Sequence, residues 1–173
     1  MKPTLTIILA FCISILFTKA QVWEINPKQS SVTFTSDHAT GSFRTITGTI
    51  NFDPKVPEKG SVALTIPVSS ISFENETQTN HALSPKWLDE SKFGSIEFKS
   101  TSIKTNGENF VAIGKITIYG VENEVSIPFS FEQTKKSGIF TGQTLIKRSD
   151  YQFGGNSEKV TEITVTVKIA VTK

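Results

Sequence analysis

Residues 162–171, EITVTVKIAV, alternate apolar and polar side chains almost without a break. The apolar members are Ile163, Val165, Val167, Ile169 and Val171, and three of the four residues between them are Thr or Lys. Successive side chains of a β-strand point to opposite faces of the sheet, so this spacing predicts a strand with one buried face and one solvated face. Such a strand is typical of an antiparallel sheet, because parallel strands are usually buried on both faces.

The same alternation recurs along most of the chain. It is clear in 61–68 (SVALTIPV) and 124–132 (EVSIPFSFE), and it is less regular at 32–34, 46–52, 96–98, 116–118 and 139–146. With a short first strand at 22–25, the count is about eight or nine strands. Short turn signals at 105–109, 119–123, 135–138 and 154–159 leave no room for helical crossovers. The pattern predicts an all-β domain, either a sandwich or a closed barrel.

One internal stretch does not alternate: residues 78–93, QTNHALSPKWLDESKF. Ser84 before Pro85 resembles a helix N-cap with proline at the first helical position, which predicts that a turn carrying Trp87 and Leu88 starts there. A further turn or two of helix is expected upstream, although Thr and Asn are poor helix formers. We therefore expect one short helical insertion at about residues 76–90.

The first twenty residues have the layout of a secretory signal peptide. Lys2 precedes an apolar run from Leu5 to Phe17, and Ala20 offers a small residue for cleavage. This predicts a signal peptide at 1–20, cleaved after Ala20, and one domain at 21–173 in the periplasm or outside the cell. The alternative is an N-terminal anchor that stays attached, although the run is short for a membrane span. No transmembrane segment is expected in the mature chain.

The charge balance of the mature chain argues against nucleic acid as a partner. The whole chain has 18 Lys and Arg residues and 16 Asp and Glu residues, and the predicted signal peptide contains two of the lysines. The mature chain is then neutral and offers no excess positive charge to a phosphate backbone. Cys12, the only cysteine, is also removed, so the domain has to be stabilised by its core rather than by disulfides.

Catalytic and metal-binding motifs are missing from the sequence. It has no Gly-x-Ser-x-Gly elbow, no His-Glu-x-x-His helix and no phosphate-binding glycine loop. Its two histidines, His38 and His81, have no regular companion carboxylates, and such histidines are more often surface or hydrogen-bonded structural residues than metal ligands. We expect no enzymatic activity, no metal and no cofactor.

Five segments together carry a resemblance to a known family: 23–38 (WEINPKQSSVTFTSDH), 41–54 (GSFRTITGTINFDP), 69–103, 114–131 (GKITIYGVENEVSIPFSF) and 146–155 (IKRSDYQFGG). In their order and spacing they resemble the YceI-like family over essentially the whole mature chain. The resemblance implies a single antiparallel eight-stranded lipocalin-like barrel, exported to the periplasm, whose lumen holds a long isoprenoid chain.

Individual residues match the family's pattern, and some depart from it. His38 matches a histidine after the first long strand, and Arg148 matches a late Arg-x-Asp-aromatic pattern. His81 matches a histidine that often follows an Arg-Asp pair, but this chain has Gln78 and Thr79 there. Polar contacts to a ligand head group are therefore in question. Two residues apart on a strand, Arg148 and Asp150 are expected to share a face and form a local pair, and a head-group contact by Arg148 is the sharper hypothesis.

If the barrel is hollow, its apolar faces and the 78–93 segment predict a lipid-binding site. An isoprenoid tail would gain most of its affinity from burial, and residues 78–93 would form a lid with Trp87, Leu88 and Phe93 at the mouth. The predicted ligand contacts are Phe34, His38, Phe43, Ile50, Phe52, Leu64, Ile66, His81, Leu83, Trp87, Leu88, Phe93, Phe98, Ile116, Ile118, Ile127, Phe129 and Arg148.

Alternatives to a lipid carrier remain at this point. One is a structural or adhesive β-sandwich with a solid core and no ligand, since alternating strands occur in any antiparallel fold. Another is an outer-membrane barrel, which is disfavoured because Trp23, Trp87, Tyr119 and Tyr151 are too few to form aromatic girdles. The sequence leaves open whether two barrels pair as a homodimer.

Overall fold

The computed structural model describes residues 21–155 and 161–173, and the predicted signal peptide at 1–20 lies outside them. The described residues form eleven strand segments and two α-helices. The elements in chain order are β1 (Val22–Ile25), β2 (Ser31–Thr35), β3 (Thr40–Phe43), β4 (Thr47–Asn51), β5 (Ser61–Pro67), β6 (Ile71–Phe73), α1 (Glu76–Leu83), β7 (Ser95–Asn106), β8 (Asn109–Ile118), β9 (Val121–Gln133), β10 (Ser137–Lys147), α2 (Arg148–Tyr151) and β11 (Glu162–Thr172), with 3₁₀ turns η1 (Pro57–Lys59) and η2 (Val68–Ser70) on either side of β5.

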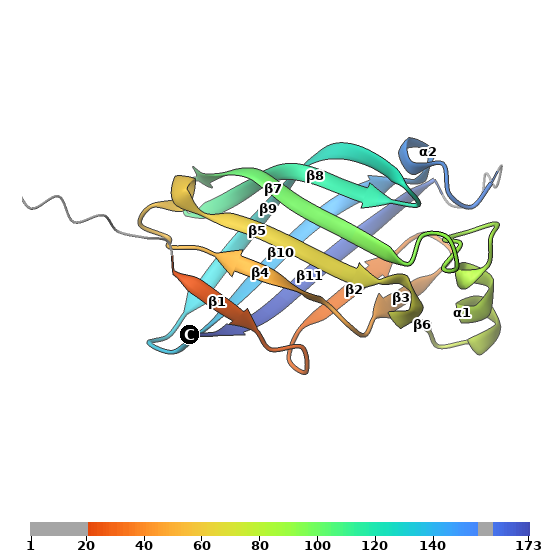
Figure 1. Cartoon of the computed structure of the whole chain (residues 1–173), viewed down its shortest axis with the longest axis horizontal. Coiled ribbons are helices and arrows are strands. Elements are labelled where there is room, and N and C mark those ends of the chain that lie inside the picture. Colours follow the sequence, from red (N-terminus) through yellow and green to blue (C-terminus); the bar gives the residue numbers. More distant parts are fainter. Residues whose placement is uncertain (1–20, 156–160) are drawn as a thin grey trace, which may run out of the picture.

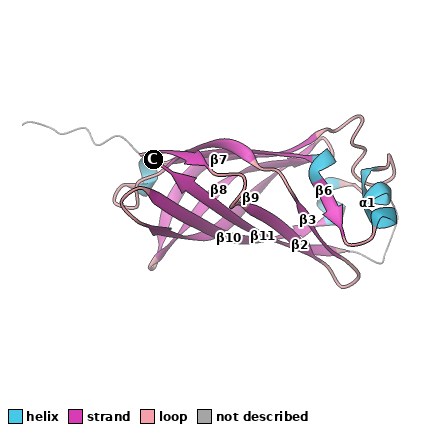
Figure 2. Cartoon of the chain, turned by 90° about the horizontal axis from the view of Figure 1, so that it is seen from below, coloured by secondary structure: helices cyan, strands magenta, loops and turns pink. Residues whose placement is uncertain are grey.

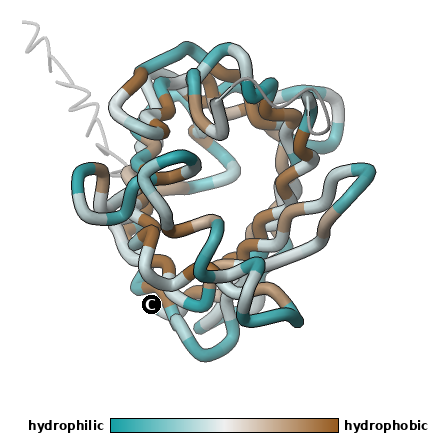
Figure 3. The backbone as a smooth tube through the Cα atoms, turned by 90° about the vertical axis from the view of Figure 1, so that its right-hand side faces the viewer, coloured by the Kyte–Doolittle hydropathy of each residue, from teal (hydrophilic) through white to brown (hydrophobic). Residues whose placement is uncertain are grey.

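The strands close into an antiparallel barrel. Hydrogen-bonded neighbours run β1-β4-β5-β7-β8-β9-β10-β11, and β1 also pairs with β11, which completes a ring of eight. Figure 3 looks along this ring from the end that carries α1 and α2. The predicted eight-stranded lipocalin-like barrel is confirmed, and the alternative of an open β-sandwich is wrong.

Three of the eight barrel strands are interrupted, so that eleven strand segments make up eight barrel strands. β1 and β2 lie one after the other along the same edge of β11: Ile25 pairs with Val171, and Val32 pairs with Val167. In the next barrel strand, β4 pairs with β1 and β3 pairs with β2. In the one after that, β5 pairs with β4 and β6 pairs with β3. The second break follows Phe43, and the third is η2, which directly follows Pro67. In Figure 1 the segments β2, β3 and β6 lie nearer to α1 than β1, β4 and β5 do.

The core divides along the barrel axis. One buried cluster, around Trp23, Phe52 and Ile103, packs between the strands, and the other, around Val68, Ala82 and Tyr151, packs beneath the helices. Both α1 and α2 lie at the barrel end opposite the C-terminus (Figures 1 and 2). The domain therefore has one end closed by the cluster around Phe52 together with the buried Pro57 of η1, and one end closed by an inserted segment.

The helical insertion has a different boundary from the expected one. α1 begins after Asn75, whose side chain accepts a hydrogen bond from Thr77 N at 2.8 Å, and it ends at Ser84. Ser84 is extended because the residue before a proline avoids the helical region. The Ser84-Pro85 pair does start a turn, in which Trp87 N donates to Ser84 O at 2.9 Å. The pair ends the helix and begins the turn that carries Trp87.

Arg148 and Asp150 do not lie on a strand, so the expected local pair is wrong. β10 ends at Lys147, and α2 contains both residues. Residues two apart on a helix point in different directions and do not face each other. The Asp150 carboxylate instead accepts a hydrogen bond from Ser149 Oγ at 3.2 Å. Among the residues that the structure describes, the salt bridge found joins Lys115 and Glu122 at 2.6 Å.

Candidate ligand-binding cavity

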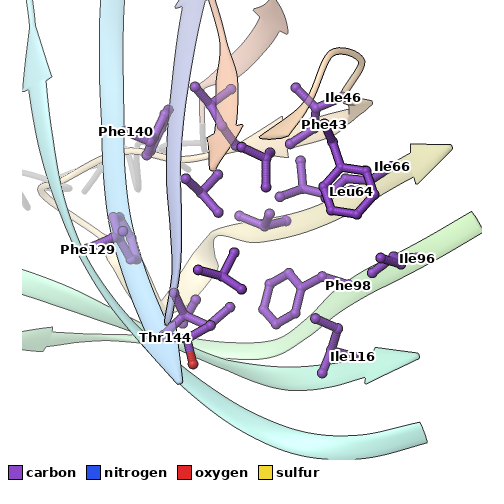
Figure 4. A pocket seen from close by; sticks show the side chains of 18 of the residues that line it. Phe43, Ile46, Leu64, Ile66, Ile96, Phe98, Ile116, Phe129, Phe140 and Thr144 are labelled. Carbon is purple, nitrogen blue, oxygen red and sulfur yellow. The ribbon is translucent and has the colours of Figure 1, made fainter. Parts of the chain in front are cut away.

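The barrel encloses an apolar cavity of about 140 Å³. Its walls come from inward-facing positions of the strands, and Thr144 contributes the one side-chain hydroxyl among them (Figure 4). Nine predicted contacts lie in this wall: Phe43, Ile50, Leu64, Ile66, Phe98, Ile116, Ile118, Ile127 and Phe129. The period-2 pattern thus identified much of the lumen.

Other wall residues were not among the predicted contacts, although all but Ala112 belong to strands that were predicted. They are Val32, Ile46, Val62, Ile96, Ala112, Phe140, Gly142, Thr144, Ile146, Val165, Val167 and Ile169. The alternation in 162–171 would have identified Val165, Val167 and Ile169. Gly142 and Thr144 have no apolar signal, and only the register of β10 places them inside.

The floor of the cavity is a cluster of aromatic rings. Phe52 is fully buried and meets Phe110, Phe129, Phe131 and Phe140 edge-on, with ring centroids 4.9–5.5 Å apart. Trp23 Nε1 donates a hydrogen bond to Phe52 O at 2.9 Å. Phe129 and Phe140 face the cavity, whereas Phe52 lies one layer below them. Edge-to-face aromatic contacts of this kind stabilise a rigid closure of the barrel end.

A second apolar cavity, of about 110 Å³, continues the first toward the helices. The two share wall residues, among them Phe43, Ile96 and Ile118. The predicted contacts Phe34, Trp87 and Leu88 line this upper cavity, with Phe73 and Phe153 beside them. Two adjoining apolar cavities, which we call the column, therefore lead from the aromatic floor to the lid.

Above the upper cavity lies a mouth pocket of about 340 Å³. It shares Phe34, Phe73 and Trp87 with the upper cavity, but it adds the polar side chains of Ser36, Thr77, Gln78 and His81. The described residues that line the mouth pocket include no Lys, Arg, Asp or Glu. The column thus ends in a neutral polar rim.

Trp87 separates the mouth pocket from the upper cavity. Its Nε1–H donates to His81 Nε2 on α1. On its other side the Arg148 guanidinium carbon lies 5.7 Å from the ring centroid, a cation–π contact. The ring is half-buried, and it is fixed by two elements that are distant in sequence.

Arg148 is buried, with 7% of its surface exposed, and does not reach into the mouth pocket. Its Nη1 donates to Phe153 O at 2.7 Å and to Gly155 O at 3.0 Å. These bonds hold the loop that follows α2 against Trp87. The geometry gives Arg148 a role in supporting the lid, and contact between Arg148 and a head group stays a prediction.

The remaining predicted contacts lie away from the three cavities. His38 is exposed in the turn between β2 and β3, where its backbone N–H donates to Ser36 Oγ at 3.4 Å. Leu83 packs at the end of α1. Phe93 packs against Tyr119, with ring centroids 4.6 Å apart. These residues and Phe52 line none of the three cavities, and their direct contact with a ligand stays a prediction.

Ionisable groups are sparse around the column. Burial, with a smaller contribution from the negative charge of Asp150, raises the pKa of Tyr151 to about 12. Within the described part of the chain, no three His, Cys, Asp or Glu side chains gather as a metal site would require. The described helices are too short or too polar to cross a bilayer. What the column offers chemically is apolar burial with neutral hydrogen-bonding groups at one end.

Comparison with known proteins gives matches over most of the chain. The YceI-like domain profile matches residues 23–172. A UPF0312 protein of Serratia proteamaculans is 32% identical over 87 residues, which are 50% of this chain and 45% of the relative. A UPF0312 protein of Ectopseudomonas mendocina is 31% identical over 118 residues, 64% of this chain and 62% of the relative. The chain thus matches about half to two thirds of the length of these relatives.

Solved structures share the barrel. BcnA of Burkholderia cenocepacia superposes with a TM-score of 0.82 at 24% identity, covering 85% of this chain and 99% of BcnA. A polyisoprenoid-binding domain of Saccharophagus degradans, implicated in plant cell wall breakdown, gives 0.67 at 10% identity and covers 88% of this chain and 98% of that domain. At these identities the superpositions establish the fold.

Proposed function

The chain belongs to the YceI-like family, and from that premise we propose that it binds a long apolar lipid of the isoprenoid class inside its barrel. The tail occupies the apolar column, and an uncharged head group sits in the mouth pocket. The protein acts as a carrier or store of the lipid and performs no chemistry on it.

The observation that carries the proposal is the column itself. Two apolar cavities of about 140 and about 110 Å³ lie end to end between the aromatic floor and Trp87. Each CH₂ transferred from water into such surroundings contributes roughly 0.8 kcal/mol. Apolar voids of roughly 150 Å³ in proteins stay dry and take up guests of benzene's size, so a flexible hydrocarbon is the guest that suits this column.

The head group is expected to be neutral. The mouth pocket offers the Gln78 amide, the hydroxyls of Ser36 and Thr77, and the His81 imidazole. An anionic head group would be bound more strongly by Arg, and the buried Arg148 donates to backbone carbonyls instead. A hydroxyl, a quinone carbonyl or an amide fits the rim. The polyisoprenoid-binding domain of Saccharophagus degradans, which has the same fold, supports the choice of tail.

We place this activity in the periplasm or outside the cell. The support is the sequence of residues 1–20, which have the charge, apolar run and small final residue of a signal peptide. Sequencing the N-terminus of the protein recovered from its native host tests this: Gln21 is expected as the first residue, and an intact Met1 in the recovered protein contradicts export by cleavage.

The direct test is extraction of protein purified from its native host, followed by mass spectrometry. We expect an apolar isoprenoid in the organic phase. As a matched pair, Ile116→Trp fills the lumen, whereas Ile139→Trp adds the same bulk on the outer face of β10, where Ile139 is 36% exposed. The lumen variant should lose most of the extracted lipid and the outer variant should retain it. Extracts without lipid from folded wild-type protein, with no uptake of added isoprenoid, contradict the proposal.

A further inference from the structure

The barrel wall has an interruption between β9 and β10. Their pairing runs from Gln133 with Gly138 to Phe129 with Gly142, and it stops there. Beyond that point β9 continues along β8 as far as Val121, and β10 continues along β11 as far as Lys147. In the described chain, residues 121–128 and 143–147 therefore face each other without a ladder. We call this opening the β9–β10 window.

A hollow of about 620 Å³ lies over the window. The hollow is lined by outward-facing side chains, namely Ser126 and Pro128 of β9 and Gln143 and Leu145 of β10. It is also lined by Val125 and Thr144, which alternate with them and face inward. A fully hydrogen-bonded wall would hide these two inward-facing side chains from the outside. Thr144 lines the lumen as well. The outer hollow and the lumen are thus separated at Thr144 by a single side chain.

The residues at the window explain why the wall is open there. Pro128 has no backbone N–H and lies next to the last ladder pair, and proline is confined to edges and ends of pairing. On β10 the inward positions between Phe140 and Ile146 are Gly142 and Thr144, the smallest side chains of that face. Little side-chain volume therefore closes the gap from inside.

The rim of the window mixes charged side chains, among them Glu124, Lys147 and Asp150, with an apolar strip at Leu145 and Pro128 along which a hydrocarbon can lie. Leu145 is 49% exposed, one of the few large apolar side chains of the described surface with more than a third of its area in contact with water. Pro128 is exposed beside it. Further along, the window ends where Asn123 Nδ2 donates to Asp150 O of α2 at 2.8 Å. It is bounded by the last ladder pair and by that one hydrogen bond.

The mouth is more firmly closed than the window. Two hydrogen bonds join the lid to the barrel: Tyr119 Oη donates to Pro85 O at 3.1 Å, and Phe73 N of β6 donates to Thr79 Oγ1 of α1 at 3.0 Å. Trp87 is held in addition by His81 and Arg148. Passage through the mouth has to break this set of contacts, whereas widening the window breaks no strand pairing.

We propose that the lipid tail enters and leaves the lumen sideways, through the β9–β10 window. The inference rests on the proposed lipid-binding function and specifies its route. It also accounts for a long tail in a short column, since the segment that exceeds the lumen can extend through the window along Leu145 and Pro128.

Cross-linking across the window tests the route. In the chain from Gln21 to Lys173, which contains no cysteine, Ser126→Cys with Gln143→Cys is bridged by a flexible bis-maleimide. A matched pair, Ser130→Cys with Thr141→Cys, joins residues that already pair in the closed half of the same two strands. A third pair, Pro85→Cys with Tyr119→Cys, bridges the mouth by tying the lid to the barrel where Tyr119 Oη donates to Pro85 O, and neither residue lines a cavity. The probe is retinol, a fluorescent isoprenoid alcohol, followed by stopped flow for association and by dilution into vesicles for release.

The window cross-link should slow association and release by about tenfold or more with an unchanged Kd, because a gate alters both rates equally. The Ser130–Thr141 and mouth cross-links should leave both rates within about twofold of the unbridged protein. Slowing by the mouth cross-link with no effect of the window cross-link overturns the inference while lipid binding itself stands. Wild-type protein that takes up no retinol or other isoprenoid overturns the proposed function and this route together.

Discussion

The half-buried indole of Trp87 lies between the mouth pocket and the upper cavity and lines both of them. The chain has two tryptophans, and the other, Trp23, is buried in the aromatic floor. The two indoles therefore report on opposite ends of the column.

We expect an isoprenoid alcohol to change the tryptophan emission through Trp87, because the tail replaces its neighbours in the upper cavity. Trp87→Phe should keep the fold and lose most of this change, whereas Trp23→Phe should retain it. The measurement is emission during a titration, with binding checked separately by equilibrium dialysis. An unchanged signal in saturated wild-type protein would assign Trp87 to the packed lid alone.

Tyr151 predicts a stability change at alkaline pH. Burial raises its pKa in the folded protein to about 12, above the ordinary value of 10.0, so the neutral phenol is favoured in the fold. The stabilisation is complete below about pH 10 and is lost as the pH rises toward 12, because the unfolded chain releases its proton first.

Urea unfolding between pH 9 and 12 should therefore show a steeper loss of stability in the wild-type protein than in Tyr151→Phe, over a range set by the ordinary and raised pKa values. The chain's other tyrosine, Tyr119, supplies the control. Tyr119→Phe should keep the steep loss and should ionise, by ultraviolet absorbance, near pH 12 when folded. Equal slopes in the wild type and Tyr151→Phe contradict the assignment.

Arg148 shows what a residue pattern cannot predict. Its spacing to Asp150 suggested two side chains on one face of a strand, but the chain turns into α2 after Lys147. The bonds of Arg148 to the carbonyls of Phe153 and Gly155 depend on a loop conformation that no local signal specifies. These bonds give Arg148 a role in supporting the lid, and the head-group contact suggested by the resemblance stays a prediction.

At the scale of elements, the strands were predictable because period-2 alternation is a local property. The points where the backbones of neighbouring strands approach closely were not, since they depend on the register of the partner strand. Gly48 on β4 is such a point: its φ is +145°, and a Cβ there would overlap the backbone carbonyl oxygen of Ala63 on β5. The sequence shows only an unremarkable glycine within a strand.

Gly48→Ala should lower the free energy of unfolding by more than about 3 kcal/mol, because strain and a clash with backbone are combined. Gly107, in the turn between β7 and β8, has φ +61°, but a Cβ added there would have no other atom within 4 Å. Gly107→Ala should therefore cost only about 1–2 kcal/mol, the conformational term alone. Urea denaturation compares the two, and equal losses would mean that the close approach to Ala63 relaxes freely.

The β9–β10 window is also a property of elements rather than of residues. Both strands alternate along their length, so each was predictable, but the point where their pairing stops is a matter of register. A trace of it is visible in the sequence, where Gly142 and Thr144 occupy inward positions of β10 between Phe140 and Ile146. That trace gains meaning only when the partner strand is known.

At the scale of the whole molecule, the barrel separates apolar burial from charge. The predicted mature chain is neutral, the column is lined by hydrocarbon, and the mouth pocket holds neutral polar groups. The two cavities together approach roughly 250 Å³, which by comparison with benzene-sized guests suits a tail segment of about ten carbons. The closed eight-stranded barrel could be expected from the family resemblance. The depth of the column could not, because it is set by how Phe129 and Phe140 pack at the floor.

Affinity should therefore depend on tail length far more than on head-group charge. Each added CH₂ contributes roughly 0.8 kcal/mol, about fourfold in Kd, until the column is full, and the gain should then level off near ten carbons. A partly exposed charge contact contributes about 0–1 kcal/mol, so exchanging an alcohol for a phosphate, or raising the salt concentration, should change Kd by only a few fold. Titrations of isoprenoid alcohols of increasing length, then of alcohol against phosphate at one length and two salt concentrations, measure both effects.

Phe140→Ala, which deepens the floor, should move the levelling point to a longer tail, while Ile139→Ala on the outer face should not. If affinity stays flat with tail length but falls steeply with salt, binding is governed by an anion contact and the column is not the site.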